Sequence, residues 1–183
     1  MTSTVISRRI SSSIAALSAQ DYEEAFIHLF PAIDRTAKLR RPKATVAGRI
    51  KGFICDEQAL VMWVATGHII GQIKVNDWDL PSALYKFGRT SIAHEGELDP
   101  RLRIHDTGEL SIGDVWNLPS SYILGLIIAV VISEENSKEH LGNDYRVSFN
   151  GASFNINALW GNRAAIESHA SNIFGRPQPF RTS

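Results

Sequence analysis

The sequence contains very little cysteine. Cys55 is the single cysteine among 183 residues, so no disulfide can form within the chain. A Cys-x-x-Cys pair is absent, which excludes a zinc site built on paired cysteines. The first nine residues, MTSTVISRR, lack the apolar core of a secretory signal. We therefore expect a cytoplasmic protein in a reducing compartment.

The sequence also lacks long apolar runs and an excess of charge of either sign. The longest apolar run, residues 122–132, is eleven residues long, whereas roughly 20 are needed to cross a bilayer. Nineteen Lys plus Arg balance nineteen Asp plus Glu, so the whole protein exerts no net field on nucleic acid or on an anionic membrane. We expect no membrane span, and any attraction for nucleic acid must be local.

The commonest catalytic signatures are absent as well. GxSxG, GxxxxGK[ST] and GxGxxG do not occur, which removes the usual hydrolase, P-loop and dinucleotide motifs. His94-Glu95 begins like a zincin motif, but Leu98 stands where the second histidine is required. We expect no metal and no cofactor. A metal held by tertiary arrangement stays open as an alternative to a solvated acidic surface, and its ligands would come from His94, Glu95, Glu97, Asp99, His105 and Asp106.

What is present predicts one mainly α domain. A content of 44% hydrophobic and 21% charged residues is ordinary for a globular chain of this length. Asp21 and Glu24 have the spacing of a capping box at the start of a helical pattern. Gly67 suits the left-handed cap of the next helix. The patterns predict a bundle of four to five helices, four of which cover residues 21–39, 45–67, 79–96 and 119–133.

Two small β-hairpins complete the predicted fold. Alternating apolar residues flank Asp106-Thr107-Gly108, and a second alternation flanks Asn150-Gly151, a pair that suits a turn in which both residues have positive φ. A last helix follows the second hairpin. We expect a single domain over residues 1–183, with a helical core at 21–133, a C-terminal hairpin and helix at 144–175, and a flexible tail at 176–183.

The stretch KFGRTSIAHEG, residues 86–96, contains the strongest candidates for chemistry, Arg89 and His94. On an ideal helix the two side chains are about 140° apart, so they bracket a face. Two copies about a two-fold axis would place both kinds of side chain in one cleft. Imidazoles could then move protons in metal-free RNA cleavage while guanidinium stabilises the phosphorus centre. Histidine suits this role because its reference pKa of ~6.5 lies near working pH. A competing interpretation is that both are surface cations favoured by the helix dipole.

Arg89-Thr-Ser-Ile-Ala-His94, placed before another apolar helix, resembles the R-x4-6-H signature of HEPN domains. The resemblance covers about residues 21–133. It implies a homodimer joined through the motif-bearing helix and the next helix, 119–133. It also implies metal-independent endoribonuclease activity on RNA in a toxin–antitoxin or other defence system, with an antitoxin or regulatory protein as a second partner. Arg89 and His94 would be catalytic, supported by Thr90 and Ser91.

A non-catalytic member that binds nucleotides or proteins is the alternative. It is motivated by Thr90, because HEPN nucleases usually carry Asn, Asp or His directly after the arginine.

Two further sets of residues could assist RNA cleavage. Residues 35–51 are basic and contain no acid, so Arg40, Arg41 and Lys43 could guide an RNA backbone, although a solvated face is the favoured interpretation. Glu57 lies on the apolar side of the second helical pattern and needs a partner if it is buried. Arg89 is an available partner for it. Trp63 and Trp116 are expected in the core or an interface.

Overall fold

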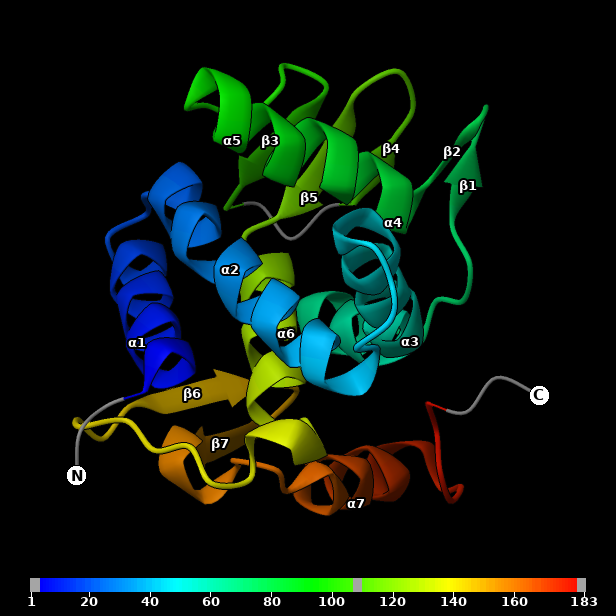
Figure 1. Ribbon diagram of the computed structural model, residues 1–183. Helices are drawn as coiled ribbons and strands as arrows, with labels where there is room; N and C mark the ends of the chain where they lie inside the picture. Colours follow the sequence, from blue (N-terminus) through cyan, green and yellow to red (C-terminus); the bar gives the residue numbers. More distant parts are fainter. Residues whose placement is uncertain (1–3, 107–109, 181–183) are drawn as a thin grey trace.

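A computed structural model describes residues 4–106 and 110–180. The fold is mainly α with small sheets, as the sequence predicts (Figure 1). Its long helices surround one hydrophobic core, and the short strands lie around them. The long helices are α1 (Val5–Ser18), α2 (Tyr22–Arg40), α3 (Val46–Thr66), α6 (Ser121–Val131) and α7 (Arg163–Phe174).

Helix α6 is the centre of the core. Ile123 and all side chains from Leu126 to Ile132 are fully buried, and α6 packs against α1, α2 and α3. Gly125 brings α6 close to α3, since a Cβ at this position would lie 2.8 Å from the carbonyl oxygen of Val61. The apolar run is therefore buried against other helices of the same chain. These side chains leave little apolar surface on α6 for the expected contact through residues 119–133, and the dimer stays a prediction.

Helix α1 was not predicted. Thr4 caps it by accepting a hydrogen bond from the amide of Ser7 at 3.3 Å. Ile6, Ile10 and Ile14 recur every four residues and are buried, and α1 packs chiefly against α2. This spacing was the available signal, but the helix also contains five serines, a residue type with modest helix propensity.

Helices α2 and α3 agree with the predicted ranges. Asp21 caps α2 by accepting from the amide of Glu24 at 3.0 Å, and Gly67 ends α3 in the left-handed conformation with φ 76°. The two helices pack against each other. In the part of the chain that the structure describes, no helix is both long and apolar enough to cross a membrane.

The first predicted hairpin is wrong. Strand β3 (Leu102–His105) pairs in parallel with β5 (Trp116–Pro119), and β4 (Ser111–Ile112) pairs antiparallel with the other edge of β5. The alternating pattern identified the strands, but local alternation carries no information on which strands pair. Thr107 and Gly108 of the predicted turn lie outside the described residues. An additional hairpin joins β1 (Lys74–Val75) to β2 (Trp78–Asp79).

The second predicted hairpin is confirmed. Strands β6 (Arg146–Phe149) and β7 (Ala152–Asn155) are antiparallel, and Asn150 and Gly151 between them have φ of 47° and 78°. Helix α7 follows a short 3-10 helix, η3 (Ile156–Ala158).

The C-terminal segment differs from the flexible tail that we expected. Pro179 and Phe180 are buried. The ring centroid of Phe180 lies 5.4 Å from that of Trp63, which is fully buried in the core. Residues 181–183 are not described.

Candidate functional site

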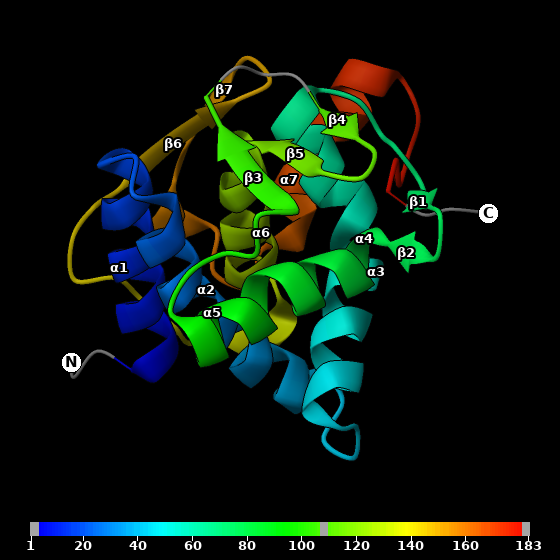
Figure 2. The same ribbon diagram turned by 90° about the horizontal axis from the view of Figure 1, so that it is seen from above.

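One continuous helix carries Arg89 and His94, as the sequence predicts for residues 79–96. It consists of α4 (Leu80–Ala83), a π-helical segment η1 (Leu84–Thr90) and α5 (Ser91–Glu95). Asp79 caps it by accepting from the amide of Ser82 at 2.7 Å, and Gly96 ends it with φ 82°. Figure 2 shows this helix lying over α2. Segments of π-helix are rare and often occur at functional sites.

The inner side of η1 is held firmly against the core. Leu84 and Phe87 are buried. Gly88 allows close packing on α2, since a Cβ there would lie 2.9 Å from Cζ of Phe30. The hydroxyl of Thr90 donates to the carbonyl oxygen of Tyr85 at 3.0 Å, a five-residue spacing that suits π-helical geometry. The backbone at Arg89 is therefore held by the packing of Gly88 and by the hydrogen bond of Thr90.

Arg89 lines a groove between α2 and the η1–α5 helix. The groove has a volume of about 270 Å³, and Phe26, Phe30 and Ile92 supply apolar surface. Cζ of Arg89 lies 5.9 Å from the ring centroid of Tyr85, within the range of a cation–π contact. Asp34 also lines the groove, but its carboxylate binds Arg49 at 2.6 Å. Among the described residues no carboxylate forms an ion pair with Arg89.

His94 is exposed near the end of the helix. Helix α5 has no buried residue, and the imidazole of His94 makes no hydrogen bond or ion pair with any residue that the structure describes. Ser91 is half-buried, and its hydroxyl likewise has no hydrogen-bond partner within the described chain. Both groups are therefore free to contact a substrate or a second copy of the chain.

The acidic and histidine side chains near this helix are not arranged as a metal site. Residues 4–106 and 110–180 contain no group of three or more His, Cys, Asp or Glu side chains that could hold a metal ion. Asp99 instead accepts from Nε and Nη2 of Arg101 at 2.9 and 2.7 Å, and these hydrogen bonds lower its pKa. Asp106 accepts hydrogen bonds from Tyr22 and Gln20. The alternative metal cluster is not assembled.

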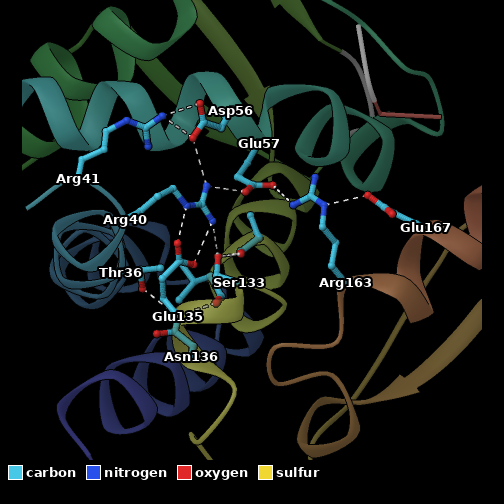
Figure 3. A network of polar contacts seen from close by, with 12 residues as sticks. Thr36, Arg40, Arg41, Asp56, Glu57, Ser133, Glu135, Asn136, Arg163 and Glu167 are labelled. Carbon is cyan, nitrogen blue, oxygen red and sulfur yellow. Dashed lines mark hydrogen bonds and ion pairs between the residues drawn. The ribbon is translucent and has the colours of Figure 1, made fainter. Parts of the chain in front are cut away.

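Glu57 is buried, as its position in the sequence suggested, but its partner is not Arg89. Oε1 accepts from Nη1 of Arg40 at 2.8 Å, and Oε2 accepts from Nη1 of Arg163 at 2.7 Å (Figure 3). The side chain is only 2% exposed. The predicted Glu57–Arg89 pair is therefore wrong, because α2 and α7 deliver two other arginines to the same carboxylate. Glu57 has no contact with the Arg89 groove.

Arg40 and Arg41 also form ion pairs with carboxylates. Arg40 binds Glu57, Asp56 and Glu135, and Nη2 of Arg41 binds Asp56 at 2.6 and 2.7 Å. Burial lowers the pKa of Arg40, but the hydrogen bonds to Glu135 and Glu57 outweigh burial and raise the pKa above its ordinary value. Lys43 is exposed, and within the described residues it has no ion pair. Of the three residues predicted to guide RNA, only Lys43 is unpaired.

Little in the sequence indicates the rest of this polar network. Arg163 is 106 residues from Glu57 along the chain, and its only local signal is the four-residue spacing to Glu167, which it binds at 2.9 Å. The network joins α2, α3, α7 and the 3-10 helix η2 (Glu134–Asn136). Removing one member of a buried ion pair costs about 3–5 kcal/mol, so the network's evident role is to hold these elements together.

A family model described as Rv1289 matches residues 5–178. The chain belongs to the Rv1289 family. The matched range of the Rv1289 model contains every element from α1 to α7, including both the Arg89–His94 helix and the Glu57 network. No curated protein matches the chain. No solved structure matches it either.

Proposed function

We propose that the protein is a metal-independent endoribonuclease of HEPN type, with Arg89 and His94 from two copies forming one composite active site. The observation that carries the proposal is the exposed imidazole of His94, which has no partner within the described residues. The same helix carries Arg89, whose charge is not neutralised by any described carboxylate. An unpaired imidazole and an unpaired guanidinium suit general acid–base catalysis beside a phosphate.

In the proposed mechanism, His94 of one copy accepts the proton of a ribose 2′-hydroxyl. The 2′-oxygen attacks the adjacent phosphorus, and Arg89 stabilises the charge that develops on the phosphoryl oxygens. The bond from phosphorus to the 5′-oxygen breaks, and His94 of the second copy protonates that oxygen as it leaves. The products are a 2′,3′-cyclic phosphate and a 5′-hydroxyl.

The surface available for the second copy is the exposed side of η1 and α5. Helix α6 cannot form the contact with the second copy, because its apolar side chains are buried in the core of one chain. The groove beside Arg89 has apolar walls from Phe26, Phe30 and Ile92, and all residues of α5 are at least partly exposed. A two-fold contact here would place two copies of Arg89 and His94 next to each other.

The alternative is a non-catalytic module that binds nucleotides or a protein. Two observations favour it. The hydroxyl of Thr90 is bound to the carbonyl oxygen of Tyr85, so it is not offered to a substrate. Arg40 and Arg41 are paired with carboxylates, which leaves the basic segment with less charge to attract RNA. This module would bind without cleaving.

Cleavage of mixed RNA by the purified protein tests the proposal. His94→Ala should lower the rate by about 10²–10⁴, the usual contribution of general acid–base catalysis. EDTA should not inhibit, because the mechanism assigns no step to a metal. His140→Ala is the matched control, since His140 is exposed and lies in the loop before β6. Its rate should equal that of the wild type.

Two results of the cleavage assay would reject the proposal. Cleavage that survives unchanged in His94→Ala, or that needs an added divalent metal, would exclude this mechanism. Sedimentation provides a second check, because a protein that stays monomeric at catalytic concentration lacks the second histidine. Absence of any cleavage by a folded dimer, together with RNA binding, would support the alternative module.

A further inference from the structure

A second cavity of about 270 Å³ lies beside η1, apart from the groove that Arg89 lines. Its walls come from the β1–β2 turn, from η1 and from the segment that joins β4 to β5. Trp78, Phe87 and Trp116 provide aromatic surface, and Asp77 and Asp114 provide carboxylates. A cavity of this size, with aromatic walls and a few polar groups, has the features of a small-ligand site.

Trp78 is the aromatic side chain with surface left for a ligand. Phe87 is 1% exposed and Trp116 is 2% exposed, so both belong to the core. Trp78 is half-buried, and its ring centroid lies 4.8 Å from that of Phe87 at an interplanar angle of 50°. Contact with Phe87 holds the indole in place. A fixed, partly exposed indole is a stacking surface for a nucleobase.

Arg101 adds a hydrogen-bond donor to the cavity beside the carboxylates of Asp77 and Asp114. Cζ of Arg101 lies 4.1 Å from the ring centroid of Phe87, a cation–π contact. Nε and Nη2 of this guanidinium are bound to Asp99, which leaves Nη1 able to donate to a ligand. A simple cation would pair with Asp77 or Asp114 but would leave Nη1 of Arg101 without an acceptor. A neutral aromatic ring that carries both N–H donors and acceptor atoms can use the carboxylates and Arg101 together.

The carboxylates select one base. Asp77 and Asp114 are exposed, and neither makes a hydrogen bond or ion pair with any described residue. A carboxylate binds best to two adjacent N–H donors. Guanine has such donors at N1 and N2, and its O6 and N7 are acceptors that can face Arg101. Adenine and cytosine each place one amino group beside an acceptor, and uracil has one N–H between two acceptors.

We propose that this cavity binds a guanine base of single-stranded RNA, stacked on Trp78 with its N–H edge toward Asp77 and Asp114. The proposal rests on the proposed function for RNA as the source of the base. Phe87 and Arg89 belong to the same helical segment, η1, so the cavity and the catalytic helix are rigidly connected. Binding here would make cleavage selective for strands that contain guanosine.

Calorimetric titration with the four ribonucleoside 5′-monophosphates is the test. Guanosine 5′-monophosphate should bind more tightly than the other three by on the order of tenfold. Trp78→Ala should weaken its binding by about tenfold or more, while Trp78→Phe, which keeps an aromatic ring, should retain most of it. The double variant Asp77→Asn, Asp114→Asn should lose the preference for guanosine. Glu134→Gln, an exposed carboxylate in η2, should bind like the wild type.

Several results would overturn the proposal. They are equal affinity for all four nucleotides, no nucleotide binding by the folded wild type, and unchanged binding in Trp78→Ala. Circular dichroism confirms that each variant is folded, and the aspartate variants change only exposed side chains. Binding of choline without binding of nucleotides would assign the cavity to an ammonium ligand.

RNA cleavage in the same preparation separates this proposal from the proposed function. Cleavage without guanosine binding would contradict the proposed guanine site and support the proposed nuclease activity. Guanosine binding without cleavage would contradict the nuclease activity and support the guanine site.

Discussion

Arg89 and His94 are held very differently by the same helix. Arg89 follows Gly88, which packs tightly on Phe30, and it lies in a groove with apolar walls. His94 is on α5, where no side chain is buried. An arginine on a firmly packed backbone and a freely exposed imidazole suit the proposed composite site, because a second copy could complete the surroundings of His94 without moving the backbone at Arg89.

The geometry of the guanidinium should matter as much as its charge. Arg89→Lys keeps the charge but loses the planar pair of donors that binds two phosphoryl oxygens, so the maximal rate of RNA cleavage should fall by about 10²-fold. Single-turnover kinetics at saturating RNA measure this step. Arg103→Lys, an exposed arginine on β3, should cleave at the wild-type rate. A nearly normal rate for Arg89→Lys would leave Arg89 as a surface cation.

At the scale of elements, the helices with clear local signals were predictable. Asp21, Gly67 and Asn150-Gly151 act through hydrogen bonds or φ values within a few residues, and all have the predicted roles. The parallel β3–β5 pair depends on contacts that no local pattern encodes. The apolar run of α6 predicted that this helix is buried. It did not predict whether α6 packs inside one chain or against a second copy, since an apolar run suits a core and a dimer contact equally.

Close packing of α6 on α3 gives a test of this arrangement. Gly125→Ala should lower the free energy of unfolding by about 1–3 kcal/mol, because the new Cβ would lie 2.8 Å from a backbone oxygen that cannot rotate away. Urea denaturation followed by circular dichroism measures the change. Gly142→Ala, where a Cβ meets no atom within 4 Å, should stay within about 0.5 kcal/mol of the wild type. Equal stability of the two variants would contradict the packing.

Over the whole molecule, the Glu57 network connects elements that are far apart in sequence. Arg40 on α2 and Arg163 on α7 meet at a carboxylate of α3, and Arg40 also binds Glu135 of η2 (Figure 3). The sequence predicted that a buried Glu57 needs a cation. Which arginine supplies it could not be predicted, because the answer depends on how α7 folds back after the β6–β7 hairpin.

The network should make stability depend on pH in acid. Burial raises the pKa of Glu135, but the hydrogen bonds with Arg40 lower it more, and the resulting pKa lies below the ordinary value of 4.5. A carboxyl group whose folded pKa is lowered binds protons more readily when unfolded. Its contribution is therefore complete above about pH 4.5 and is lost as the pH falls through the folded pKa.

Glu135→Gln removes this titration. The variant should be less stable than the wild type at pH 7, and it should lose less stability than the wild type between pH 7 and pH 3. Urea unfolding at both pH values gives the difference. Asp79, Asp99 and Asp144 also have lowered pKa values, so both proteins should weaken in acid, and only the difference between them reports Glu135. Glu134→Gln, which changes an exposed neighbour, should show the acid loss of the wild type. An equal acid loss in Glu135→Gln would mean that Arg40 draws its stabilising contacts from Glu57 and Asp56.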